Sequence, residues 1–187
     1  MVLHIRSFTF AARHAALLLA LAAVPAAAAA TIDVHLQRNG DTVLIEARAL
    51  LEADAGTSWQ VLTDYARYPA FIPGIRSSEV IARTGSNVTV AQTGDAVWLF
   101  GAPVHVVYEI TEWPMSRVES RIASGCECTL ESAYSLAPSG EGVAMTYGGR
   151  LTLHDGILTP IERAAAGRAV VREFRALAEE IERKAAR

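Results

Sequence analysis

The stretch Val61-Leu-Thr-Asp-Tyr65, followed closely by Tyr68-Pro-Ala-Phe-Ile-Pro-Gly74, joins a helical turn, an aromatic–proline cluster and a glycine stop. The residue before a proline is pushed out of helical geometry, so Tyr68 and Ile72 mark bends. We predict a short helix that ends near Asp64 and a second, bent helical piece around 69–72. Asp64 is a candidate general base, but a polar residue at such a bend more often caps a helix.

Upstream, the segment Thr42 to Leu51 alternates and then ends apolar, as expected for a strand with one wet face after the turn at 39–41. Asp54 is placed to cap the first helix, because its side-chain oxygen can accept from free amides of the first turn. The buried stripe of this helix is predicted to be Ala55, Trp59 and Leu62.

Downstream of Arg76 the apolar residues recur every second position, with turns about every ten residues, which predicts an antiparallel meander. The predicted strands are Ser77–Arg83, Val88–Thr93, Val104–Trp113, Arg117–Ala123, Glu127–Leu136 and Val143–His154. One face of this sheet is expected to be apolar and to carry several tyrosines.

The chain closes with a predicted helix from Pro160 to about Ala185, which would be ~39 Å long. Thr159 and Glu162 have the spacing of a capping box, and Pro160 suits the first helical position. The predicted apolar stripe is Ile161, Ala164, Gly167, Val171, Phe174, Ala178 and Ile181, with the charged residues, Glu173 among them, mostly on other sides. Small residues in the stripe would let the helix approach closely or leave room for something else.

Residues 1–30 follow the three-part pattern of an export signal, with Arg6 and Arg13 ahead of a short apolar run and alanines suited to cleavage. The apolar run from Ala15 to Val24 is too short to cross a bilayer, which takes ~20 residues. We therefore expect residues 1–30 to be a signal peptide, residues 31–187 to be one domain, and the protein to be periplasmic or secreted. An uncleaved anchor and a disordered leader are the alternatives.

Without that segment the basic residues fall from 17 to 15 while 20 acidic residues remain, giving 15 − 20 = −5. Lys184 is the only lysine, and no basic block occurs, so no nucleic-acid partner and no stable membrane insertion after signal removal are expected. The remaining length suits one domain with a substantial core, and we expect a monomer.

The order of strand, two short helices, long meander and final helix resembles the START-like, polyketide cyclase/dehydrase and coenzyme Q-binding (SRPBCC) superfamily. The residues that carry the resemblance are Trp59–Tyr65, Tyr68–Gly74, Tyr108–Pro114 and Ser132–Leu136. It implies an α+β helix-grip fold, in which a curved antiparallel sheet wraps around the long C-terminal helix and two short helices follow the first strand. It also implies an internal cavity for a small hydrophobic ligand such as a lipid, an isoprenoid quinone or a polyketide-like molecule.

Within that fold, aromatic and small residues on the inner face are the candidate ligand-binding set. They are Trp59, Tyr65, Phe71, Trp98, Phe100, Tyr108, Tyr134, Met145, Tyr147, Gly167 and Val171. The apolar run Ala96–Pro103 is interpreted either as a flap over the cavity mouth or as a packed hairpin. The rings at Tyr65, Tyr68 and Phe71 either border the entrance or, more commonly for such rings, pack against the final helix.

Catalytic motifs are lacking: the sequence has no G-x-S-x-G elbow, no glycine-rich phosphate loop and no H-x-x-x-H pair. No catalytic residue, metal site or cofactor is predicted. His105 and His154 lie opposite the apolar sets, and Arg121, Glu131 and Arg150 are expected to form a solvated ladder. Binding without covalent catalysis is therefore the favoured function. A cyclase or dehydratase-like enzyme, which needs a buried ionisable group, and a periplasmic interaction module are the alternatives.

Cys126 and Cys128 are the only cysteines. On a regular strand their Cα atoms would lie near the upper limit for a disulfide, and a bulge after Gly125 would bring them into range. A local disulfide is slightly favoured over a redox pair or two free thiols, and two thiols alone do not make a structural metal site.

Overall fold

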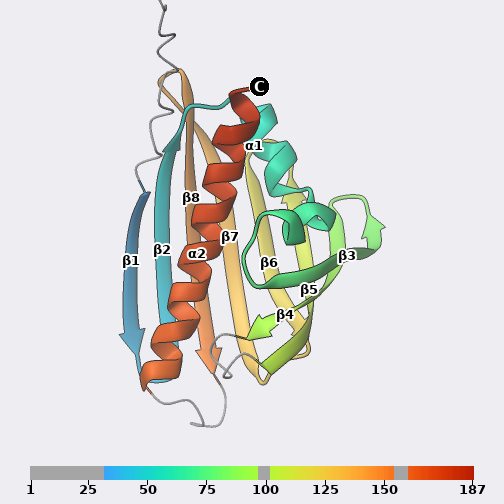
Figure 1. The fold of residues 1–187 in the computed structure, drawn as a ribbon, viewed down its shortest axis with the longest axis vertical. Coiled ribbons are helices and arrows are strands. Elements are labelled where there is room, and N and C mark those ends of the chain that lie inside the picture. Colours follow the sequence, from blue (N-terminus) through green and yellow to red (C-terminus); the bar gives the residue numbers. More distant parts are fainter. Residues whose placement is uncertain (1–31, 97–101, 154–159) are drawn as a thin grey trace, which may run out of the picture.

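The computed structural model of the protein describes residues 32–96, 102–153 and 160–187. In this part of the chain eight antiparallel strands form one curved sheet, and the long helix α2 lies across one face of it (Figure 1). The strand order is β1-β2-β8-β7-β6-β5-β4-β3. The strands span β1 Ile32–Asn39, β2 Thr42–Leu51, β3 Ile75–Thr84, β4 Asn87–Ala96, β5 Ala102–Trp113, β6 Arg117–Ser124, β7 Cys128–Ser139 and β8 Gly142–Leu153. The helices span α1 Ala55–Leu62, the 3-10 helix η1 Tyr65–Ala70 and α2 Pro160–Ala185.

This architecture confirms the predicted α+β fold, but one strand was not predicted. β1 pairs with β2 along its whole length, from Ile32 opposite Ala49 to Asn39 opposite Thr42. The signal was available, because apolar Ile32, Val34 and Leu36 alternate with polar residues before a tight turn at Gly40. The first strand was predicted to begin only after that turn, so β1, which forms half of a hairpin with β2, is an addition to the predicted fold.

The first short helix forms where it was predicted, whereas the second begins earlier than the predicted 69–72 and spans Tyr65–Ala70. Asp54 caps α1, since its Oδ1 accepts from the Thr57 amide at 2.8 Å. Asp64 occupies the N-cap position of η1, but its side chain makes no capping hydrogen bond and lies 3.9 Å from the Arg67 guanidinium instead. The prediction that Asp64 is a cap residue is therefore correct for its position in the chain, but its side chain does not make the capping hydrogen bond.

The core lies between the inner face of the sheet and α2. Phe174, Leu177, Ala178 and Ile181 of the helix are fully buried, as are Ile45 and Met145 of the strands. α2 packs closely on β1 and β2 at its first half, where Gly167 is buried and a Cβ there would meet the Leu36 side chain at 3.1 Å. Of the two roles considered for this glycine, close approach is the one observed. The predicted cap at Thr159 and Glu162 lies outside the residues whose side chains are described.

Candidate functional site: a tyrosine-lined cavity with one carboxyl group

A cavity of about 60 Å³ lies between α2, the short helices and the sheet. It has room for several waters or for a group of a few atoms, because one water needs ~10–15 Å³ by this measure. Its lining comprises Leu62, Tyr65, Tyr68, Gln92, Tyr108, Ile110, Val118, Ser120, Leu130, Ser132, Tyr134, Tyr147, Val170 and Glu173. Elements far apart in the sequence thus converge on one space inside the fold.

Four of the candidate residues border this cavity, namely Tyr65, Tyr108, Tyr134 and Tyr147. Tyr108, Tyr134 and Tyr147 come from the inner faces of their strands, as the alternation predicts, and Tyr65 comes from η1. The Tyr134 ring is held by its neighbours, since its centroid lies 4.8 Å from that of Tyr147 and 6.2 Å from that of Phe174 in a stacked arrangement. That they bind a ligand stays a prediction.

The polar centre of the cavity is Glu173, which the sequence analysis placed on an outer side of the helix. In the structure its side chain is only partly exposed and lines the cavity, and Oε1 lies 3.5 Å from the Tyr134 hydroxyl. Burial raises the pKa of the Glu173 carboxyl to about 7, and the contact with Tyr134 opposes the rise only in part. Near neutral pH this group exists in both protonation states.

The tyrosines around Glu173 stay protonated. Burial raises the pKa of the Tyr108, Tyr134 and Tyr147 hydroxyls, and the nearby Glu173 carboxylate raises them further. The Tyr68 hydroxyl also has a raised pKa and donates to the Leu62 carbonyl at 2.7 Å. These hydroxyls are therefore hydrogen-bond donors throughout the physiological pH range.

A second buried carboxyl group, that of Glu112, contacts Tyr65 of the cavity lining but does not itself line the cavity. Glu112 accepts from the Tyr65 hydroxyl at 2.9 Å and from the two terminal nitrogens of Arg83 at 2.7 and 3.2 Å. This bidentate pair supplies the positive charge that a buried carboxylate needs. Because its charge is balanced, the Glu112 cluster is a structural link between β3, β5 and η1.

The other candidate residues do not border the cavity. Trp59 and Phe71 are half-buried and pack on the outside of the core, and Met145 is fully buried within it. Gly167 faces Leu36. Val171 does not line the cavity, whereas its neighbour on α2, Val170, does. Trp98 and Phe100, and most of the proposed flap at 96–103, lie outside the described residues.

The lining residues that were not predicted are partly apolar and partly polar. Gln92, Ser120 and Ser132 alternate with outward residues of their strands and so share the inner face with apolar neighbours. This pattern could have identified them from the sequence. Val170 and Glu173 carried no such signal, because they lie at the edge of the helical stripe. Which edge residues turn inward depends on how the helix is rotated against the sheet.

Two larger hollows, of about 720 and 510 Å³, lie on the opposite face of the sheet and are open to solvent. The larger hollow is lined in part by Arg121 and Glu131 of the predicted ladder, and the Arg121 guanidinium donates to Glu109 rather than to Glu131. The other is lined by different charged residues, among them Asp33, Glu46 and Arg48. Their size does not make them better candidates, because exposed paired charges favour water over an apolar ligand. His35 and His105 are exposed on strands, as predicted for His105, and His154 lies outside the described residues.

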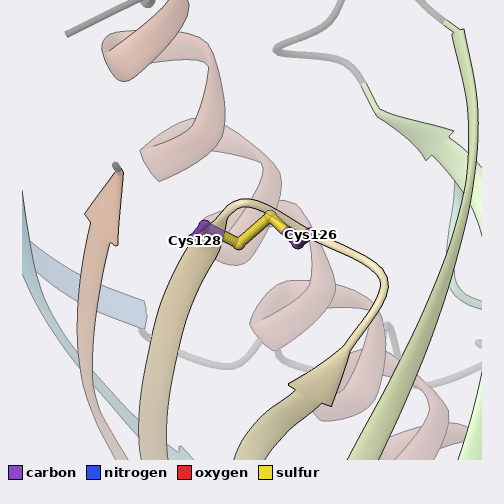
Figure 2. The surroundings of a disulfide bond; sticks show 2 residues. All are labelled: Cys126 and Cys128. Carbon is purple, nitrogen blue, oxygen red and sulfur yellow. A yellow bond between two sulfur atoms is a disulfide. The ribbon is translucent and has the colours of Figure 1, made fainter. Parts of the chain in front are cut away.

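The two cysteines form a disulfide in the turn between β6 and β7 (Figure 2). The strand ends at Ser124, and Gly125 takes a φ of 95°, where a Cβ would collide with the His105 carbonyl oxygen. This turn brings the Cα atoms of Cys126 and Cys128 to 5.1 Å, within the range for a bridge.

Within the described segments no group of three or more His, Cys, Asp or Glu side chains is arranged to hold a metal ion. None of the helices searched among those residues is both long and apolar enough to cross a bilayer.

Comparison with known proteins places this geometry in a family. Residues 42–186 match the profile of the family described as polyketide cyclase / dehydrase and lipid transport. The chain belongs to this family. The match covers β2 through α2, which are the elements that enclose the cavity, and it confirms the resemblance drawn from the sequence. No curated protein sequence matches the chain.

Solved structures confirm the START-like helix-grip fold of this family member. The Zhui aromatase/cyclase from a Streptomyces species has a TM-score of 0.66 at 17% identity, over 76% of this chain and 95% of that one. A START superfamily protein from Mycobacterium smegmatis has a TM-score of 0.63 at 16% identity, over 75% and 97%. A STAR-related lipid transfer protein from Xanthomonas axonopodis has a TM-score of 0.60 at 18% identity, over 80% and 93%. At these identities the likeness concerns the fold alone.

Proposed function

We propose that this family member binds a small hydrophobic molecule in the cavity between α2 and the sheet, without covalent catalysis. The observation that carries the proposal is the internal cavity, lined by apolar side chains and by the tyrosines at 65, 108, 134 and 147. Burial of apolar ligand surface would drive binding, at about 25 cal/mol per Å² before ordering costs, and the hydroxyls would orient the ligand.

The ligand class we propose is a lipid, an isoprenoid quinone or a polyketide-like molecule. Pockets that hold such ligands measure ~300–1,000 Å³, well above the 60 Å³ found here. The described cavity therefore suits one end of the molecule, and binding the remainder requires movement of the lining. Several lining residues, Tyr108, Leu130 and Val170 among them, are only partly buried and so have room to move.

A cyclase or dehydratase-like enzyme is the second candidate, and Glu173 favours it. This activity needs a buried ionisable group beside the cavity, and Glu173 is such a group, with a pKa of about 7. A general acid or base works best when its pKa lies near the working pH. The periplasmic interaction module predicts a filled core, and the cavity argues against it.

Export is part of the proposal. The N-terminal signal pattern motivates it, and the disulfide between Cys126 and Cys128 is consistent with an oxidising compartment such as the periplasm. The mass of the protein recovered from the native periplasm tests this, with loss of about the first thirty residues expected. Recovery of the full-length chain from the cytoplasm would refute export.

The binding proposal is tested by extracting the purified protein with organic solvent and analysing the extract by mass spectrometry. We expect one hydrophobic molecule in stoichiometric amount. Replacing Val170 with Trp fills the cavity and should remove the ligand, whereas the matched change Arg172→Trp on an exposed position of the same helix should retain it. A protein that carries nothing, or a Val170→Trp variant that still carries the ligand, would contradict the proposal.

A further inference from the structure

Tyr134 of β7 and Glu173 of α2 both line the cavity, and their side chains point toward each other. The two side-chain oxygens lie 3.5 Å apart, at the upper limit of a hydrogen bond and well beyond the ~2.5–3.0 Å of a strong one between oxygens. Two donors that each lie about 2.7 Å from one shared oxygen are themselves ~3.5–4.5 Å apart. The spacing therefore suits two groups that bind a third oxygen between them better than two groups that bind each other.

Both groups can donate. The Tyr134 hydroxyl remains protonated, and burial keeps a large fraction of Glu173 protonated near neutral pH because its pKa is about 7. Among the described residues no ion pair involves Glu173, in contrast to Glu112 and Glu180, which pair with arginines. The described part of the chain therefore supplies no cation that would hold Glu173 as a carboxylate.

The remaining groups that face Glu173 are neutral hydroxyls. Tyr68 comes from η1, Tyr108 from β5 and Tyr147 from β8. Tyr68 is occupied by the Leu62 carbonyl, and the Tyr147 hydroxyl interacts with Ser132. These hydroxyls can donate hydrogen bonds, and the described residues that line the cavity include no Arg, Lys or His.

We propose that Tyr134 and Glu173 form a two-donor site for a carbonyl oxygen, so that the ligand is a ketone, quinone or similar acceptor-bearing molecule. This inference rests on the proposed binding of a hydrophobic ligand in the same cavity. A tyrosine paired with a neutral carboxylic acid is an arrangement that also stabilises an enolate oxygen in catalysis. The same pair would therefore serve the enzyme candidate without a change of ligand class.

The test uses acetophenone and its isostere α-methylstyrene, in which a methylene group replaces the carbonyl oxygen. At pH 6 wild-type protein should bind acetophenone about 3- to 10-fold more tightly, the effect of one or two net hydrogen bonds. Tyr134→Phe should lose about that factor for acetophenone and leave α-methylstyrene unaffected. The carbonyl stretch of bound acetophenone should lie at lower frequency in wild type than in Tyr134→Phe, a signature that a purely structural role would not produce.

The pH dependence has a definite sign. Protonated Glu173 is the binding form, so acetophenone affinity should fall up to about tenfold between pH 6 and pH 8 as Glu173 loses its proton. Glu173→Gln, which retains a neutral N–H donor, should abolish this dependence. Affinity that rises with pH, or equal affinity for the two probes, would overturn the two-donor site.

Val170→Trp separates the two levels of inference. If neither probe binds, or if Val170→Trp leaves binding unchanged, ligand binding in the cavity fails and the two-donor site fails with it. If both probes bind with equal affinity and Val170→Trp blocks them, the cavity is confirmed as a binding site and only the role of Tyr134 and Glu173 is refuted.

Discussion

Glu173 and Glu180 lie two turns apart on the same face of α2, yet their surroundings shift the pKa of the carboxyl group in opposite directions. Glu180 is 7% exposed, and its carboxylate accepts from the Arg183 guanidinium at 2.6 Å and lies 3.8 Å from Arg67 of η1. The hydrogen bond from Arg183 has the largest effect in lowering the pKa of Glu180, and Arg67 lowers it further. Burial instead raises the pKa of Glu173 to about 7. One carboxyl group fixes the helix to its neighbour, and the other is left available for a ligand.

The difference teaches that burial alone does not decide the role of an acidic residue. What decides it is the partner side chain: Glu180 has Arg183 of its own helix and Arg67 of η1, whereas Glu173 has Tyr134 of β7. A buried carboxylate with a cation is a structural contact, while one that faces only hydroxyls is costly to the fold and is the kind of perturbed group that marks functional sites.

Truncating Phe174, the aromatic residue next to Glu173, should have the largest effect on stability. Phe174 is fully buried and stacks on Tyr134, so Phe174→Ala should lower the free energy of unfolding by about 3–5 kcal/mol. The cavity left behind would admit water and move the Glu173 pKa toward its ordinary value. Urea unfolding measures the loss, with the exposed Arg175→Ala as a control expected within ~0.5 kcal/mol. A loss below about 1 kcal/mol would mean that this residue is not packed as described.

Neutralising Glu173 should have the next largest effect, and it should be stabilising. The folded-state pKa of about 7 exceeds the ordinary 4.5, so the folded state binds more protons and the stability of wild type falls as pH rises from about 4.5 to 7. At pH 8 Glu173→Gln should therefore be more stable by about 2–3 kcal/mol, and near pH 4 the two proteins should be equal. Denaturant unfolding at both pH values measures the difference. A variant less stable than wild type at pH 8 would show that the charged form has a partner.

The same substitution at Glu180 should act weakly and with the opposite sign. Glu180→Gln should destabilise by about 0.2–1 kcal/mol at pH 7, because Arg67 and Arg183 are largely exposed and can be solvated instead. The lowered pKa means that wild type holds this advantage above about pH 4.5 and loses it as pH falls through the folded-state value. Stabilisation by Glu180→Gln at pH 7 would erase the contrast between the two carboxyl groups.

Much of the fold could be predicted from local patterns. Alternation identified β3 to β8 and their inner faces, Asp54 was identified as the cap of α1, and the stripe through Phe174, Ala178 and Ile181 identified the buried side of α2. β1 was missed although its pattern was present. The inward tyrosines were found because a strand has only two faces, so the choice at each position is binary.

The site itself was predicted only in part. Met145 and Gly167 were candidates because they lie on inner faces, but they fill the core and the helix contact instead. A cavity is a gap between elements, so no single element contains the information about where side chains fail to fill space. The cavity residues Gln92 and Ser132 show this, because their polarity made them poor core candidates and yet the gap lies beside them.

By itself, the sequence of this protein determined its secondary structure, the faces of its strands and its place in a family, because these depend on periodicities of two and 3.6 residues along one chain. The tertiary structure alone decided that Glu173 turns inward beside Tyr134 while Glu180, with the same chemistry on the same helical face, lies beside Arg67 of η1. The rotation of α2 against the sheet sets these neighbours, and rotation is a property of two packed surfaces rather than of either sequence pattern.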